Sequence, residues 1–221
     1  MISPFLGVRR KSDAGQGVSS GGVTKSRHEK VLQHDNHTCR CCGFRSLQFQ
    51  RVVPYEGDFV TMCAFCEQCF ALDAVGAMGS GVLIWLPEIS QINLNHIARA
   101  VYVARASDNS KLSELANRAF DGLMARRTDA KRRLGSDDPL LLATVFHESL
   151  DDQEYKDREK KLEGIRLMPV DKRLVAARSG TVDMFPRMLQ YWISPEGPFG
   201  RLPIDKWEEM FSSAVGSISK N

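Results

Sequence analysis

The spacing of the cysteines constrains this chain more than any other sequence feature. All six cysteines lie between residues 39 and 69 of a chain of 221 residues, in the stretch HTCRCCGFRSLQFQRVVPYEGDFVTMCAFCEQCF. CxxC pairs about twenty residues apart are typical of a structural zinc site, because each pair of thiolates holds one edge of the metal tetrahedron. A shell of four thiolates leaves no position for water, so the pattern predicts a structural Zn²⁺ ion that takes no part in catalysis.

The spacing leaves one choice open among the ligands. Our preferred set is Cys39, Cys42, Cys63 and Cys66. Gly43 permits the turn that follows the first pair, and the second pair lies where a strand-like FVTM segment runs into a helix. Cys69 lies one helical turn further on and is the alternative ligand, in a Cys66/Cys69 pair. Cys41 would be a spare thiol, and the nearby histidines are expected at the surface: His28, His34 and His37.

Composition excludes several classes of protein. Thirty basic and 27 acidic residues give a net charge of +3, which is too small to indicate a nucleic-acid-binding protein. The 43% hydrophobic content excludes wholesale disorder, and no run of about 18 apolar residues is present to span a membrane. The N-terminal MISPFLGVRRKS lacks the apolar stretch of a secretory signal. We therefore expect a cytoplasmic protein whose cysteines are reduced or bind metal.

Hydrophobic periodicity predicts an α+β fold with two parts. We expect a flexible tail over residues 1–22, which ends in a Gly/Ser-rich stretch, and a single domain over 23–221. Within that domain, about 24–90 form the zinc core and about 90–221 form a mostly helical remainder. Residues 81–87 predict a buried strand, and 151–163 a solvated helix or linker. Expected helices cover 25–35, a segment capped by Ser90, 110–134, a segment starting at Asp137 or Asp138, 184–193 and 204–215.

The order of elements around the cysteines resembles the ββα-metal core of HNH endonucleases. The resemblance covers about 25–75: a helix, a CxxCG knuckle, a strand, a turn with a proline, and a strand that runs into CxxC. In active members, an Asp-His or His-His pair stands before the proline, where this chain has Gln50 and Arg51. Glu67 occupies the place of a later His or Asn. Phosphodiester hydrolysis needs a general base and a catalytic metal ion, and the residues for both are missing here. We therefore expect no enzyme activity.

A second resemblance covers about 24–135. The segments FVTMCAFCEQCF and VGAMGSGVLIWLPEISQINLNHIARAVYVA are similar to the DotN/IcmJ component of type IVB (Dot/Icm-like) secretion and conjugation systems. The resemblance implies a noncatalytic zinc-binding adaptor of the coupling complex, which binds the C-terminal region of the coupling ATPase. It also implies a cytoplasmic location that is peripheral to the inner membrane through the complex. Direct membrane contact and nucleic-acid binding are not expected.

The alternative is an HNH-type endonuclease or a DNA-binding zinc module derived from one. It draws on a basic cluster that could contact phosphates: Arg126, Arg127, Lys131, Arg132 and Arg133. A helix C-terminus favours cations through its dipole, so a solvated helix end explains the same residues. His96 and His147 lie on expected helices without a partner at ligand spacing, and we assign them no catalytic role.

Overall fold

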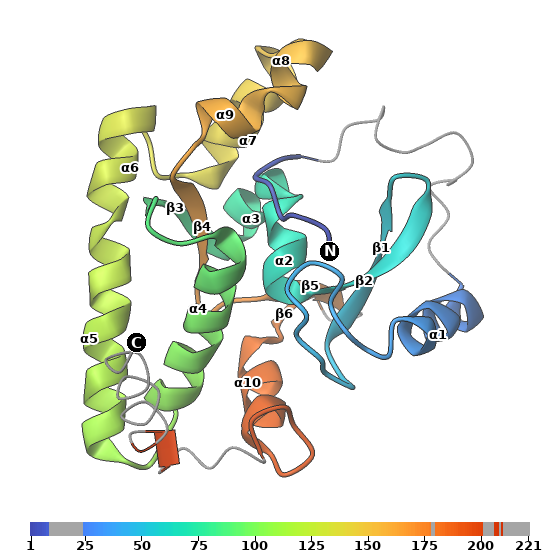
Figure 1. Cartoon of the computed structure of the whole chain (residues 1–221), viewed down its shortest axis with the longest axis vertical. Helices are drawn as coiled ribbons and strands as arrows, with labels where there is room; N and C mark the ends of the chain where they lie inside the picture. Colours follow the sequence, from blue (N-terminus) through green and yellow to red (C-terminus); the bar gives the residue numbers. More distant parts are fainter. Residues whose placement is uncertain (9–23, 178–179, 201–205, 208, 210–221) are drawn as a thin grey trace, which may run out of the picture.

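The computed structural model describes residues 1–8, 24–177 and 180–200, together with 206, 207 and 209. The described residues combine helices with small antiparallel sheets, which confirms the expected α+β class. In chain order, the elements are α1 (Lys25–His34), β1 (Gln50–Tyr55), β2 (Asp58–Cys63), α2 (Ala64–Cys69), α3 (Leu72–Met78), β3 (Gly81–Trp85), α4 (Gln91–Arg105), α5 (Ser110–Ala125), α6 (Arg127–Leu134), α7 (Pro139–Glu148), α8 (Asp152–Lys156), α9 (Arg158–Lys161), β4 (Ile165–Pro169), β5 (Leu174–Ala177), β6 (Gly180–Asp183) and α10 (Phe185–Ile193) (Figure 1).

Strands β1 and β2 form a hairpin that leads directly into a helix. Val53 lies opposite Val60 in the antiparallel register. The two turn residues, Glu56 and Gly57, both have positive φ angles (49° and 84°), as the favoured two-residue hairpin turn requires. Strand β2 ends at Cys63 and α2 begins at the next residue, while α1 packs against the hairpin (Figure 1). The hairpin and α2 therefore form one continuous unit around the cysteine region.

A second antiparallel pair joins distant parts of the chain. Strand β3, which was expected within 81–87, pairs with β4 so that Leu83 lies opposite Leu167. Both leucines are buried, and α4 packs against β4. The chain therefore leaves the sheet after β3, forms helices α4 to α9, and returns to pair as β4. Strands β4, β5 and β6 were not expected from the sequence.

The helical part agrees with the expected caps but not with every expected length. Ser90 caps α4, as predicted, by accepting a hydrogen bond from the Asn93 amide at 3.2 Å. Asp138 caps α7. The single helix expected over 110–134 is divided at Arg126, whose carbonyl accepts a hydrogen bond from the Trp85 amide at 3.2 Å. Helix 184–193 is observed as α10, and most of the helix expected over 204–215 lies outside the described residues.

The first eight residues pack against the rest of the molecule. Leu6 and Val8 are buried. The Gly7 amide donates to the Cys69 carbonyl at 2.8 Å, and the Ile2 amide donates to the Arg40 carbonyl at 2.9 Å. This packing differs from the flexible tail expected over 1–22, because apolar residues near the start of the chain find partners that are distant in sequence. Residues 9–22 lie outside the described residues.

Two hydrophobic clusters make up the core. The first surrounds the cysteines and includes Ile84 and Leu94, together with aromatic residues of α10. The second lies among α3, α7 and the β3–β4 pair, and it includes Leu72 and Leu167. Within the described ranges, no helix is both long enough and apolar enough to cross a membrane. The division into a core over about 24–90 and a helical part over about 90–221 stays a prediction.

Candidate metal centre

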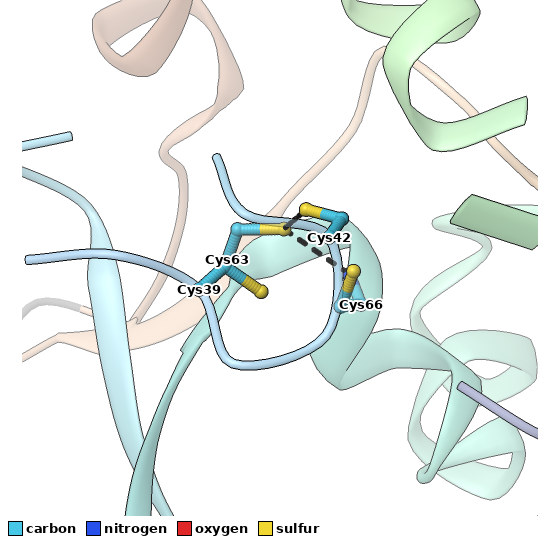
Figure 2. A group of neighbouring side chains, drawn as sticks. All are labelled: Cys39, Cys42, Cys63 and Cys66. Atoms are coloured by element: carbon cyan, nitrogen blue, oxygen red, sulfur yellow. Dashed lines mark hydrogen bonds between the residues drawn. The ribbon is translucent and has the colours of Figure 1, made fainter. Parts of the chain in front are cut away.

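Four buried cysteine side chains meet between the knuckle and the start of α2. Their sulfur atoms all lie within 4.8 Å of one another, and they belong to Cys39, Cys42, Cys63 and Cys66 (Figure 2). These are the four preferred ligands of the sequence analysis. The structure places Cys63, and not Cys69, with the other three.

Backbone hydrogen bonds hold the first pair in place. The Gly43 amide donates to the Cys39 carbonyl at 2.9 Å, and Gly43 has a φ of 71°, a conformation that a side chain would strain. The Arg40 amide donates to the Thr61 carbonyl at 2.8 Å, which joins the knuckle to β2. Thr61 in turn donates its amide to Asp35 Oδ2 at 2.9 Å. The knuckle is therefore fixed against the strand that delivers the second pair.

The second pair is positioned by the junction between β2 and α2. Cys63 is the last residue of β2 and the N-cap of α2, and its sulfur accepts a hydrogen bond from the Cys66 amide at 3.5 Å. An N-cap side chain points back toward the first turn of its helix, so both sulfurs face the same side. The Cys42 and Cys63 sulfurs lie 3.7 Å apart. That separation matches the edge of about 3.8 Å expected for a tetrahedron with Zn–S bonds of about 2.3 Å.

The two remaining cysteines lie outside this group of four. Cys41 and Cys69 are both fully buried. The Cys69 thiol donates to the Phe65 carbonyl at 3.5 Å, and burial raises its pKa, so it stays protonated. A hydrogen bond with Cys39 raises the pKa of Cys41. Both residues therefore have the properties of neutral core thiols.

Hydrogen bonding and burial shift the pKa values of the four clustered thiols in opposite directions: those of Cys39 and Cys42 fall, and those of Cys63 and Cys66 rise. A hydrogen bond with Cys39 raises the pKa of Cys42, but bonds with Cys63 and Cys66 and the charge of Arg99 lower it to about 7. Hydrogen bonds from the neighbouring thiols also lower the pKa of Cys39. Four sulfurs of the right chemistry, buried together and close to tetrahedral spacing, fit a Zn²⁺ ion. When bound there, zinc would supply structural cross-linking.

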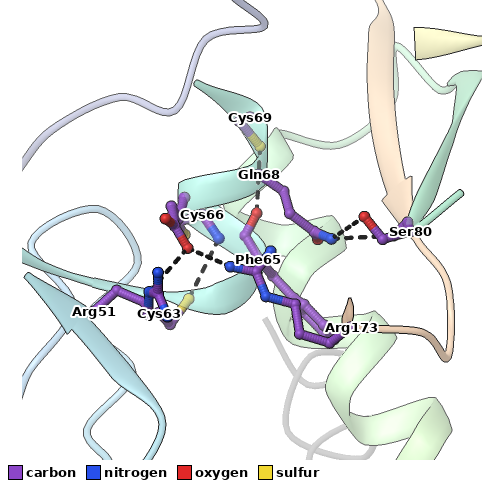
Figure 3. Close-up of polar contacts among 9 residues, drawn as sticks. Arg51, Cys63, Phe65, Cys66, Gln68, Cys69, Ser80 and Arg173 are labelled. Atoms are coloured by element: carbon purple, nitrogen blue, oxygen red, sulfur yellow. Dashed lines mark hydrogen bonds and ion pairs between the residues drawn. The ribbon is translucent and has the colours of Figure 1, made fainter. Parts of the chain in front are cut away.

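Three residues stand where active HNH enzymes have catalytic residues: Gln50, Arg51 and Glu67. Each of them forms hydrogen bonds or ion pairs within the fold. The buried Gln50 amide donates to the carbonyls of His37 and Phe44, at 2.9 and 2.8 Å. Glu67 is buried, and its carboxylate receives Arg51 at 3.6 Å and Arg173 at 2.5 Å (Figure 3). The Glu67 carboxylate is therefore engaged by two guanidinium groups within the fold. Arg173, which comes from the unexpected strand region, could not be anticipated from the motif.

The basic cluster is engaged within the fold. Arg126 pairs with Glu88 at 3.1 Å, and Arg127 and Lys131 both pair with Asp137. Arg132 pairs with Asp129 at 3.0 Å, and the Arg133 guanidinium lies 3.8 Å from the centroid of the Trp85 ring. The cluster therefore has intramolecular partners that account for its position.

Helix α4 contributes two polar residues that the sequence analysis did not single out, Asn95 and Arg99, together with His96, for which it expected no partner. Arg99 and Asn95 are buried and donate hydrogen bonds to sulfurs of the group of four, and His96 contacts the Cys42 carbonyl at 2.9 Å. The available signal was the spacing: Asn95 and Arg99 share a helical stripe with Leu94, Ala98 and Tyr102. Polar residues on an apolar stripe indicate buried partners.

Comparison with known proteins identifies a relative that matches most of the chain. No protein-family model matches it. The chain is 34% identical, over 157 residues, to the type 4 apparatus protein DotN of Legionella pneumophila subsp. pneumophila (strain Philadelphia 1). The alignment covers 66% of this chain and 72% of that relative. This identity and coverage confirm the family indicated by the sequence motifs: the chain belongs to the family of the type 4 apparatus protein DotN.

Proposed function

We propose that this protein is a noncatalytic component of a type IV secretion apparatus, in which it serves as an adaptor of the coupling complex. The observation that carries the proposal is its kinship with a type 4 apparatus protein. The candidate metal centre supports it, because buried thiols without a place for water suit a scaffold and not a reaction centre. The protein then works at the cytoplasmic face of the inner membrane, held there by its partners.

In this proposal, Cys39, Cys42, Cys63 and Cys66 bind one structural Zn²⁺ ion. The β1–β2 hairpin followed by α2 is an HNH-like frame that has kept its metal-held architecture without hydrolytic residues. Gln50, Arg51 and Glu67 support this reading, since each is occupied by hydrogen bonds or ion pairs within the frame. None of the three supplies the imidazole that serves as general base in active HNH enzymes.

The proposed partner is the C-terminal region of the coupling ATPase, as the family resemblance implies. Such recognition uses apolar anchors that enter a groove with a polar rim. The test is co-expression of the full chain with the ATPase C-terminal region, followed by size-exclusion chromatography at micromolar concentration. Co-elution in one peak is expected. Two separate peaks, with the zinc content of this protein intact, would overturn the adaptor proposal.

A nuclease assay tests the competing function. Supercoiled plasmid incubated with the purified protein and Mg²⁺, Mn²⁺ or Ni²⁺ is expected to remain uncut. Salt-sensitive DNA binding is likewise not expected, since the basic cluster is paired within the fold. Metal-dependent nicking, or binding that weakens when Arg132 and Arg133 are both changed to Ala, would favour the HNH-derived function instead.

A further inference from the structure

Helix α4 presents two buried hydrogen-bond donors to the clustered sulfurs. Asn95 and Arg99 lie one helical turn apart and are 0% and 1% exposed. Asn95 Nδ2 donates to Cys66 Sγ at 3.3 Å. The Arg99 guanidinium reaches two further sulfurs through Nη2, Cys63 Sγ at 2.7 Å and Cys42 Sγ at 3.5 Å. Three of the four sulfurs therefore accept a hydrogen bond from the same face of one helix.

The surroundings of Arg99 leave the sulfurs as its countercharge. Its guanidinium carbon lies 4.2 Å from the centroid of the Phe44 ring and 5.3 Å from that of Phe65. Among the described residues, no carboxylate lies within ion-pair distance of it. Burying a cation without a compensating partner costs on the order of several kcal/mol. The sulfurs of Cys63 and Cys42, which accept hydrogen bonds from its guanidinium group, are therefore the groups that can compensate its buried charge.

The neighbouring histidine extends this contact to the knuckle. Arg99 Nη1 lies 3.3 Å from His96 Nδ1, and His96 Nε2 lies 2.9 Å from the Cys42 carbonyl. A guanidinium can only donate and a carbonyl can only accept, so His96 accepts at Nδ1 and donates from Nε2. Arg99 thus touches Cys42 through its sulfur and, by way of His96, through its backbone.

We infer that Arg99 and Asn95 are positioning residues of the metal centre: both orient its sulfurs, Arg99 partly neutralises the thiolates, and the packing of α4 depends on the bound metal. Four thiolates around Zn²⁺ carry a net charge of −2, and one buried guanidinium reduces it to −1. When the metal is removed, the sulfurs are no longer held in place, so Asn95 and Arg99 lose their fixed hydrogen-bond acceptors and α4 loses part of its attachment to the core. This inference rests on the proposed zinc site.

The first test measures zinc affinity by competition with a chromophoric chelator, using the full chain and its Arg99→Met, Arg99→Lys and Asn95→Leu variants. Partners that orient metal ligands typically contribute about 10–100-fold to metal affinity. We expect a loss in that range for Arg99→Met and a smaller loss for Arg99→Lys, which keeps the charge but not the planar fork. Asn95→Leu should weaken binding less than Arg99→Met, because it removes a neutral donor.

The matched control is Arg158→Met. Arg158 is a partly buried arginine that donates to the Leu6 and Tyr155 carbonyls, at 2.9 and 2.6 Å, and contacts no cysteine. It should leave zinc affinity unchanged. If Arg99→Met and Asn95→Leu both bind zinc within twofold of the unaltered protein, the inference is overturned. An unaltered protein without bound zinc would instead overturn the proposed zinc site itself, so the two failures are distinguishable.

A second measurement remains informative if Arg99→Met does not fold. Hydrogen exchange of the unaltered protein is followed with zinc and after chelation. Protection should fall in α4 as well as in the cysteine segments, whereas α7, whose described residues form no hydrogen bond with the group of four, should change less. Unchanged protection of α4 after complete removal of the metal would contradict the proposed coupling.

Discussion

The hydroxyl group of Tyr155 forms two hydrogen bonds with the backbone of Val8, accepting from its amide at 2.9 Å and donating to its carbonyl at 2.8 Å. These bonds join residues that are 147 positions apart and attach the start of the chain to α8. Tyr155 is buried, and its ring packs edge-on against Phe146 with centroids 5.6 Å apart. The first eight residues are therefore part of the folded core.

Tyr155→Phe should destabilise the protein without changing its shape. The substitution leaves two buried backbone groups of Val8 without a partner, at a cost of about 1–3 kcal/mol in the free energy of unfolding. Urea titration measures this cost, and limited proteolysis should show earlier cleavage near the N-terminus. Tyr191→Phe is the control, because the Tyr191 hydroxyl forms no hydrogen bond with the described residues. Equal stabilities for the two variants would argue against the attachment.

Single Cys→Ser substitutions should divide the cysteines into two groups. Loss of any sulfur in the group of four should lower the zinc content from one ion per chain toward zero and unfold the cysteine region, since zinc contributes about 10–16 kcal/mol to small zinc domains. Cys41→Ser and Cys69→Ser should retain the ion. Elemental analysis and far-ultraviolet circular dichroism provide the measurement. Loss of zinc from Cys41→Ser with retention in Cys39→Ser would contradict the ligand assignment.

Two glycines in neighbouring helices should respond in opposite ways to alanine. Gly135 ends α6 with a φ of 79°, so Gly135→Ala forces a side chain into the left-handed region and should cost about 1 kcal/mol. Gly122 lies within α5, where an added Cβ meets open space. Gly122→Ala should therefore stabilise the protein by about 0.5–1 kcal/mol. Thermal unfolding of both variants should give shifts of opposite sign.

The ion pair of Asp137 predicts an acid-sensitive contribution to stability. Burial alone would raise the pKa of Asp137, but the hydrogen bond and charge of Arg127, with Lys131, lower it below its usual range. The contribution is therefore fully present above the unfolded pKa of about 4 and is lost as the pH falls through the lower folded pKa. At pH 7, Asp137→Asn should lower the free energy of unfolding by about 1 kcal/mol.

The difference between Asp137→Asn and the unaltered protein should shrink as the pH falls below about 4. Urea titrations at several pH values measure it. Asp108→Asn is the matched control, because Asp108 is exposed and forms no ion pair with the described residues. A difference that stays constant down to the acid transition would rule out the ion pair as its source.

Sequence patterns predicted the features that depend on neighbouring residues. Ser90 caps α4 as expected, and Asp138, one of the two expected candidates, caps α7, because N-capping is a contact over two or three positions. The CxxC spacing likewise indicated which sulfurs could meet, although the choice between Cys63 and Cys69 stayed open. The structure resolves their positions through the strand-to-helix junction at Cys63.

The features that the sequence did not predict depend on distant partners. The division between α5 and α6 coincides with the contact between the Arg126 carbonyl and the Trp85 amide, which no local propensity reveals. Strand β4 carries Arg166 and follows a strongly charged stretch, so it has little strand character until β3 pairs with it. Arg99 was missed for a related reason: its countercharge comes from sulfurs far away in sequence.

The pairing of β3 with β4 has a consequence for tolerance of length changes. The chain leaves this ribbon toward α4 and comes back to it after α9, so the excursion is anchored at a common base (Figure 1). Asp108 and Asn109 lie within the excursion, in the connection after α4, and both are exposed. A reporter domain inserted there should leave the β3–β4 pairing intact. The knuckle and the β1–β2 hairpin should then keep their relative positions.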